Sequence, residues 1–262
     1  KAPRRLFLFQ MLNKKSYTNA GLHFLGSVLA ICLIAVPTFL MWYPSPINIM
    51  TGGGNIFLLL IAVDILCGPL LTLFVSGRKK TKNEALFDFG VIVVLQGLAL
   101  IYGIWSIQTT RPIYLVHELD RFKLISSADV DPKELDTVSK SLTVGLFEPL
   151  KPVSLRAPNP SERKEVLFES VQGGRDYGER PIFYIEYSGA SVYATGKEVE
   201  SFIKTYGTPE NYRRLEKILN QHKISLRDIR YVPIIAKEDW VAVLKADVEV
   251  TGYLKGDGFA MQ

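Results

Sequence analysis

Cysteine and histidine are scarce in this chain, which contains two of the former and three of the latter. Cys32 and Cys67 both fall within apolar runs, so the sequence after residue 67 has no thiol and cannot form a disulfide. His23, His117 and His222 lie far apart and have no neighbouring cysteine or histidine at the spacing of metal ligands. The sequence therefore predicts no metal site, no cofactor and no redox chemistry.

Residues 109–262 contain no run of basic residues with interleaved aromatic residues, as nucleic-acid binding would require. Up to residue 108, nine lysines and arginines stand against three acids, whereas the remainder has twenty-two bases and twenty-three acids. The net charge of +5 therefore comes from the N-terminal part of the chain. We interpret it as a signal of membrane topology and expect no nucleic-acid partner.

Charged residues are also nearly absent from three long apolar runs. Residues 20–43 and 89–110 contain no Asp, Glu, Lys or Arg, and residues 56–77 contain only Asp64. Because about 20 helical residues cross the hydrocarbon core of a bilayer, we predict three transmembrane helices in contact with lipid. The first run is longer than the apolar region of a signal peptide, about 7–15 residues, and no Ala-x-Ala site follows it. We therefore expect it to be retained.

The connections between these runs differ in charge, which predicts their orientation. Residues 1–19 form a basic arm without acids, the first loop "PSPINIMTGGGN" is uncharged, and the second loop "SGRKKTKNEALFD" is basic. The positive-inside rule places the arm in the cytoplasm and everything after the third run outside. The predicted division is a cytoplasmic arm (1–19), a transmembrane bundle (20–110) and an outer domain (111–262). Aromatic residues suited to the outer interface close the first and third runs: Trp42, Tyr43, Tyr102 and Trp105.

The predicted outer domain is a mixed α/β domain. "RPIYLVHELDRFKLIS" (111–126) is rich in strand-forming residues and has a turn signal near Asp120-Arg121, which indicates a strand or hairpin. A second strand is predicted over 180–189. Residues 229–256 predict a meander of three strands with polar turns near 237–239 and 246–247.

Three helices are predicted between these strands, each with a proline at its first position. The first has Asp131 as its cap and Glu134 at the capping-box position. The second begins within "PNPSERKEVLF", and the third covers 208–225 with Thr208 as its cap. The apolar stripe expected on the third helix comprises Tyr212, Leu215, Ile218 and Leu219.

Asp64 is unexpected, because a charged side chain at mid-membrane costs about 2.5–3.5 kcal/mol on insertion scales. It is either a protonated carboxyl bonded to a neighbouring helix, or a recognition point for a partner's polar group within the bilayer. Asp64, Cys67, Gly68 and Thr72 share one face of their helix. Pro69 removes an N–H and displaces the carbonyl of Ile65, which predicts a bend or a local opening.

The other two runs have matching stripes of small and polar residues. Such stripes let helices approach closely and form hydrogen bonds across the contact. They predict a compact bundle with a seam that can accept a fourth helix from another protein. The stripes are His23, Ser27 and Ala30 in the first run, and Gln96, Ala99, Gly103 and Ser106 in the third.

The sequence contains no pattern typical of a catalytic centre. No second carboxylate lies in a membrane run, as an intramembrane aspartyl protease would need. Neither His-Glu-x-x-His, Gly-x-Ser-x-Gly nor a phosphate loop is present. We therefore do not expect an enzyme.

Four segments carry a resemblance to a known family: "VDILCGPLLTLFV", the basic loop after it, "VIVVLQGLALIYGIW" and "RPIYLVHELDRFKLI". On these segments the chain resembles the type IV pilin accessory proteins of the TfpX/TfpZ kind, also called FimB-like. The order of three membrane helices followed by an outer α/β domain is similar too. The resemblance covers nearly the whole chain, is most specific in 64–74 and 111–122, and is looser between 130 and 205.

This resemblance implies an inner-membrane chaperone that acts on major type IV pilin before the pilus assembles. A pilin has an apolar N-terminal helix held in the membrane and a globular head outside, and its helix carries one buried glutamate and, after processing, an N-terminal amine. We expect the bundle to receive the pilin helix and the outer domain to hold the head. The candidate partner-binding residues are Asp64, Gly68, Pro69, Thr72, Gln96, Gly103, Arg111 and Tyr114.

Residues 111–122 have two interpretations. They form either a first strand that fixes the domain near the membrane, with Arg111 at the lipid head groups, or an exposed strand edge that pairs with a strand of the pilin head. Two other functions also stay open. The chain is alternatively a structural component of the pilus assembly machine, or a membrane-anchored sensor whose outer domain binds a small ligand.

Overall fold

A computed structural model of the chain describes residues 14–76, 81–246 and 250–260. Most of the predicted basic arm, Arg78–Lys80 of the second loop, and residue 247 of the last predicted turn lie outside the described residues. The chain divides into two compact units. One takes in the chain up to Leu40 together with residues 53–108, and the other takes in residues 41–52 and those from 109 onward.

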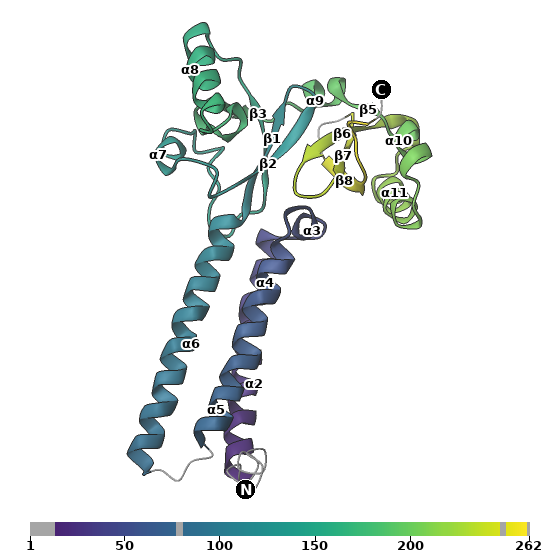
Figure 1. The fold of residues 1–262 in the computed structure, drawn as a ribbon. Coiled ribbons are helices and arrows are strands. Elements are labelled where there is room, and N and C mark those ends of the chain that lie inside the picture. Colours follow the sequence, from purple (N-terminus) through teal and green to yellow (C-terminus); the bar gives the residue numbers. More distant parts are fainter. Residues whose placement is uncertain (1–13, 77–80, 247–249, 261–262) are drawn as a thin grey trace, which may run out of the picture. The chain divides into compact units, whose positions relative to one another are not determined.

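The first unit is helical (Figure 1). Its first helix is α2 (Lys14–Pro37), which continues into the π turn η1 (Thr38–Trp42). The second is built from α4 (Gly53–Ala62), the π turn η2 (Val63–Cys67) and α5 (Gly68–Ser76), and the third is α6 (Lys82–Thr110).

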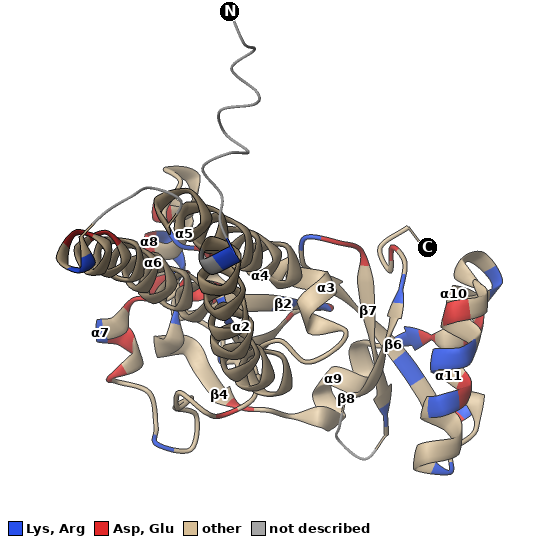
Figure 2. Ribbon diagram, turned by 90° about the horizontal axis from the view of Figure 1, so that it is seen from below, with Lys and Arg blue, Asp and Glu red and all other residues tan. Residues whose placement is uncertain are grey.

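These helices match the three predicted apolar runs. Among the described residues, three helices are long and apolar enough to cross a membrane: Ser16–Trp42, Gly53–Ser76 and Lys82–Thr110. Each begins several residues before its predicted start. Only 11%, 28% and 6% of their most apolar stretches is buried, so most of their apolar surface faces outward. Figure 2 shows hardly any charged residues between the ends of these helices. Apolar surfaces of this kind are suited to contact with the hydrocarbon of a membrane.

The second unit is a mixed α/β domain built on one sheet. Among the described residues the strand order is β4-β3-β1-β2-β6-β7-β8, with β5 paired to β6. The pairs β1–β3 and β2–β6 are parallel, and the others are antiparallel. The strands are β1 (Pro112–Glu118), β2 (Arg121–Ser126), β3 (Lys151–Leu155), β4 (Tyr184–Glu186), β5 (Lys197–Glu198), β6 (Ile229–Ile235), β7 (Trp240–Lys245) and β8 (Val250–Lys255).

The helices of this unit begin where the sequence places caps. Asp131, Asn159 and Thr208 each accept a hydrogen bond from a backbone N–H of the first turn, as N-cap residues do. The capping box predicted for Glu134 is not seen, because its carboxylate pairs with Arg175 at 3.2 Å. The helices are α3 (Ile47–Thr51), α7 (Pro132–Leu135), α8 (Pro160–Val171), α9 (Gly189–Thr195), α10 (Val199–Tyr206) and α11 (Pro209–His222).

Both faces of the sheet are covered at β6 and β7. Successive strand residues point to opposite sides, so each face has its own set of packed side chains. On one face, Tyr231 and Val243 pack with α10 and α11. On the other, Val232 and Trp240 pack with Val192 of α9. A third cluster, around β1 and β3, comprises Ile113, Tyr114, Val116, Ile125, Val130, Leu142, Val153 and Tyr184.

The segment that connects the first two long helices is part of this domain. Ile47 and Met50 of α3 are 3% and 0% exposed and belong to the same cluster as Trp240. The backbone N–H of Lys237 donates to the carbonyl of Met50 at 3.0 Å. Because residues 41–52 and the chain from 109 onward form one unit, they lie on the same side of any membrane that the helices cross.

Several details differ from the predictions. Only Tyr184–Glu186 of the segment 180–189 forms a strand, since Pro181 starts a 3-10 turn instead. Tyr212 is 53% exposed and does not belong to the apolar stripe of α11. Its neighbour Asn211 is fully buried and bonds to the backbone of Tyr206 and Lys255.

The predicted hairpin and meander are confirmed. The turn between β1 and β2 lies at Leu119 and Asp120, one residue earlier than predicted, because Glu118 pairs with Arg121.

Candidate functional site

Asp64 lies in a π turn of the second long helix. This turn, η2, interrupts the α-helical ladder between α4 and α5 and ends at Cys67, two residues before Pro69. Proline removes one backbone donor and displaces the carbonyl four residues earlier, which is that of Ile65. The local opening predicted near Pro69 is therefore present in the structure. Single π turns within α-helices are frequent at functional sites.

Asp64, Gly68 and Thr72 are buried inside the bundle, whereas Cys67, predicted on the same face, is exposed. The exposed fraction is 5% for Asp64 and 1% for Thr72. Thr72 has a partner in the first helix, since its hydroxyl lies 2.6 Å from Nδ1 of His23. The Thr72–His23 contact therefore joins α5 to α2 and leaves Asp64 as the remaining polar group of this face.

The third helix approaches the second through two glycines. Gly68 of α5 lies against the side chain of Gln96, and Gly103 of α6 lies against that of Leu60. A Cβ atom on either glycine would overlap its neighbour. Two predicted site residues, Gly68 and Gly103, thus permit the close contact between these helices, as small residues do in membrane bundles.

The carboxylate of Asp64 has no hydrogen-bond partner among the described residues. Both of its oxygens are buried, and so is Oε1 of Gln96, which is likewise unpartnered. The amide nitrogen of Gln96 donates instead to the backbone carbonyl of Asp64, at 3.3 Å. An unpaired buried acceptor costs about 1–3 kcal/mol. Among the described residues, the carboxylate of Asp64 is therefore not bonded to a neighbouring helix, and only its backbone carbonyl accepts from Gln96.

These groups open into a cavity of about 510 Å³ between α2 and α6. Its volume lies within the range of about 300–1,000 Å³ that is usual for ligand sites. A cavity of this size can hold side chains from one face of a further helix, but it is too small for a whole helix. The residues that line it are Asn19, Leu22, His23, Gly26, Ser27 and Ala30 of α2, Asp64 of the second helix, and Phe89, Val93, Gln96, Gly97 and Leu100 of α6.

The predicted stripes account for only part of this lining. His23, Ser27 and Ala30 line the cavity as one stripe of α2, and Gln96 contributes from α6. Sequence reasoning missed Asn19 and Gly26 on the first helix and Gly97 on the third. Asn19 lies four residues before His23, so extending the stripe by one turn would have found it. Pro69, Thr72 and Gly103 are not among the lining residues.

Arg111 lies in the second unit and is only 6% exposed. Its guanidinium donates to the carbonyls of Gly145 and Leu146 and lies over the ring of Trp42, 5.4 Å from the centroid. It is thus held by protein groups next to the end of the third long helix, and its side chain ties the loop around 145 to Trp42.

Tyr114 is fully buried, and its hydroxyl donates to the carbonyl of Leu142 at 2.9 Å. Burial, followed by the nearby charge of Glu148, raises its pKa to about 12. The hypothesis that 111–122 offers an exposed strand edge is wrong, because β1 lies between β2 and β3 and pairs with both. The other interpretation, a structural first strand, agrees with these pairings.

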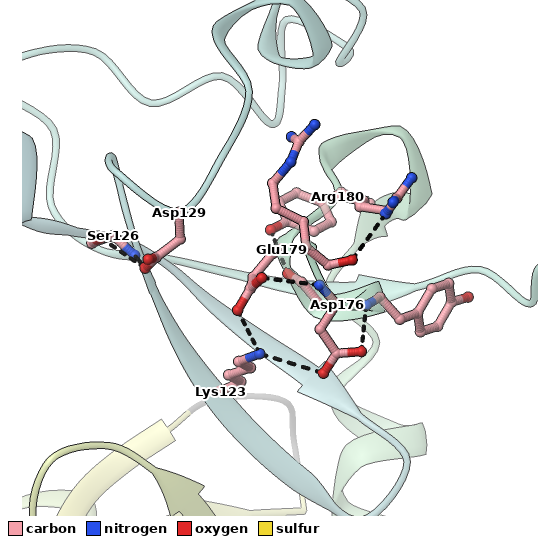
Figure 3. A network of polar contacts seen from close by, with 10 residues as sticks. Lys123, Ser126, Asp129, Asp176, Glu179 and Arg180 are labelled. Carbon is pink, nitrogen blue, oxygen red and sulfur yellow. Dashed lines mark hydrogen bonds and ion pairs between the residues drawn. The ribbon is translucent and has the colours of Figure 1, made fainter. Parts of the chain in front are cut away.

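A second polar cluster surrounds Lys123 on β2 (Figure 3). Its ammonium lies 2.8 Å from Glu179 and 3.5 Å from Asp176, and Glu179 also accepts from the backbone N–H of Asp176. Burial alone lowers the pKa of Lys123, but the hydrogen bond to Glu179 and the carboxylates around it raise it overall. Because these charges are paired with one another, the cluster fastens the 176–179 turn to the sheet and offers no open site.

The chain is similar over nearly its full length to proteins of Dichelobacter nodosus. It is 28% identical to the fimbrial assembly protein of serogroup I over 260 residues, which is 95% of this chain and all of the relative. The protein of serogroup E1 is 27% identical over the same share of both chains. That of serogroups C1 and C2 is 37% identical over 128 residues, 47% of this chain and 98% of the relative. No family model matches the chain, and no solved structure does.

Proposed function

The chain belongs to the family of fimbrial assembly proteins, and on that basis we propose that it is an inner-membrane chaperone for the major type IV pilin. The names of its relatives indicate a role in fimbrial assembly, and the assignment to type IV fimbriae is part of this proposal. In this proposal the N-terminus is cytoplasmic, the α/β domain is periplasmic, and the chain has no catalytic activity. The membrane bundle binds the apolar N-terminal helix of pilin, and the outer domain binds its head.

The observation that carries the proposal is the unpartnered carboxyl of Asp64 beside an open cavity. A lone polar group in hydrocarbon is costly for each protein that has one. When two such groups meet across a helix contact, both are satisfied at once. A guest helix that brings a polar group to Asp64 and Gln96 is therefore stabilised where a purely apolar helix is not.

The guest helix is expected to lie along the seam between α2 and α6. Small residues line this seam on both sides, including Gly26 and Ala30 on α2 and Gly97 on α6. Small residues allow a further backbone to approach closely, and van der Waals packing is a main source of helix association in lipid. The cavity then receives the guest's side chains while its backbone stays outside.

The first test replaces Asp64 by Leu, which is apolar and similar in size. One hydrogen bond between membrane helices is worth about 1–2 kcal/mol in model peptides, so pilin affinity should fall roughly 5–30-fold. Asp64→Asn keeps hydrogen bonding and should retain most of the binding if charge is not required. Leu66→Ala is the control, because Leu66 is 57% exposed on the same helix. The readout is the amount of pilin that co-purifies, at matched melting temperature of the variants.

Crosslinking locates the guest directly. A photoreactive residue at position 30 or 97 should capture pilin, because both positions line the cavity. The neighbours Leu29 and Leu98 are each 63% exposed and do not line it, so they serve as matched controls. Equal capture from 29 and 30 would exclude the seam as the binding site. Capture of other assembly-machine proteins without pilin would favour the alternative of a structural component.

A further inference from the structure

A short loop of the second unit exposes two large apolar side chains beside the ends of two membrane-length helices. Leu146 and Phe147 are 43% and 65% exposed, whereas Leu142, a few residues earlier, is buried in the domain. The loop lies between α7 and β3, and neither Leu146 nor Phe147 belongs to the core clusters of the domain. We call residues 144–148 the apolar loop.

The apolar loop is fastened to the ends of the first and third long helices. The indole N–H of Trp42, the last residue of the first helix, donates to the carbonyl of Leu146 at 2.6 Å. Arg111, the residue after the third helix, donates to the same carbonyl and to that of Gly145. All of these residues belong to one compact unit, so the contacts fix the loop relative to the helix ends.

These contacts set the depth of the loop in a membrane. If the helices cross a bilayer, Trp42 and Arg111 lie where the hydrocarbon meets the head groups, the region that Trp and Arg side chains prefer. A carbonyl that both residues hold by hydrogen bonds lies at the same level. The side chains of Leu146 and Phe147 then extend from that level, and apolar side chains there gain from leaving water.

We infer that the apolar loop inserts into the interfacial region of the bilayer and contacts lipid. It gives the outer domain a contact with the membrane in addition to the three chain crossings. The charges in the loop's neighbourhood are compatible with a head-group region: Glu148 accepts from the N–H of Gly145, and Lys151 lies 3.7 Å from Glu148. This inference does not depend on the proposed binding of pilin.

The test compares two phenylalanines of equal exposure on the same domain. Phe147 of the apolar loop is 65% exposed and Phe168 of α8 is 67% exposed. Within this domain, α8 lies far from the N-terminal end of β1, where the loop is fastened (Figure 1). The full chain, with Cys32 and Cys67 replaced by Ala, carries Phe147→Cys or Phe168→Cys and a nitroxide label. It is placed in nanodiscs of phosphatidylethanolamine and phosphatidylglycerol.

The measurement is the ratio of the label's accessibility to oxygen, which concentrates in lipid, over that to a water-soluble nickel chelate. We expect this ratio to be at least severalfold higher at 147 than at 168. Leu146→Cys is a second variant on the same loop and should behave like 147. Equal ratios at 146, 147 and 168 would show that the loop is in water and would overturn the inference, whether or not pilin binds.

Discussion

At the scale of single residues, Asp64 and Leu119 both occupy positions that ordinary folding preferences disfavour. Asp64 is a buried carboxyl without a partner among the described residues, in a helix that has no other charged residue. Leu119 has a positive φ of 57° at the first position of the two-residue turn between β1 and β2. The two differ in what surrounds them: Asp64 borders a cavity, whereas Leu119 is 81% exposed. Of the two, only Asp64 lines a cavity that a partner's side chain would fill under the proposed function.

The turn at Leu119 offers a clean stability prediction. The left-handed conformation costs an L-residue about 1–2 kcal/mol, whereas glycine adopts it freely and loses about 0.5–1 kcal/mol in extra chain entropy. Leu119→Gly should therefore stabilise the outer domain by about 0.5–1 kcal/mol, measured by chemical denaturation of the full chain. Asp120→Gly is the control, since residue 120 has no positive φ and gains nothing. A loss of stability in Leu119→Gly would mean that the leucine side chain makes a contact that compensates for its strain.

At the scale of elements, local signals predicted most of the helices and strands. Prolines and caps located α7, α8 and α11, and lack of charge located the three long helices. Local signals failed where contacts between residues distant in sequence determine which side chains are buried and how the helices pack. Asn211 looks like a surface residue, but it is buried because it satisfies backbone groups of β8 and of the residue that ends α10. The small residues of the membrane runs predicted contacts between helices, but not that a cavity would remain between α2 and α6.

Composition did not reveal that α3 is part of the domain core. Its segment was recognised only as an uncharged loop, yet it contains two of the domain's buried residues, Ile47 and Met50. Met50→Ala should destabilise the domain by about 2–5 kcal/mol, as expected for a fully buried methionine. Ile49→Ala should change it by less than about 1 kcal/mol, because Ile49 is 39% exposed. Hydrogen exchange of β6 and β7 peptides measures both, and equal protection in the two variants would contradict a core role for α3.

At the scale of the whole molecule, the chain passes between its two units three times. The second unit takes its residues from the loop between the first two long helices and from the chain after the third. Folding of that unit therefore requires both segments to lie on one side of the membrane. The charge pattern predicts the same arrangement independently, because the uncharged first loop and the domain are both assigned to the outside.

Sidedness can be measured with single cysteines in a variant whose Cys32 and Cys67 are replaced by Ala. Ser45 in the first loop, Lys164 in α8 and Asn83 at the start of α6 are all exposed. In intact cells, a membrane-impermeant maleimide that passes the outer membrane should label cysteines at 45 and 164. A cysteine at 83 should react only after the inner membrane is permeabilised.

The possible outcomes separate the fold from the orientation. If 45 and 164 react together but only after permeabilisation, the domain is intact and the orientation is inverted, so it cannot meet a pilin head in the periplasm. If 45 and 164 differ in sidedness, the packing of α3 against β7 is itself excluded, because one compact domain cannot be divided by a bilayer. Only shared labelling from outside, with 83 protected, is consistent with both the structure and the proposed chaperone role.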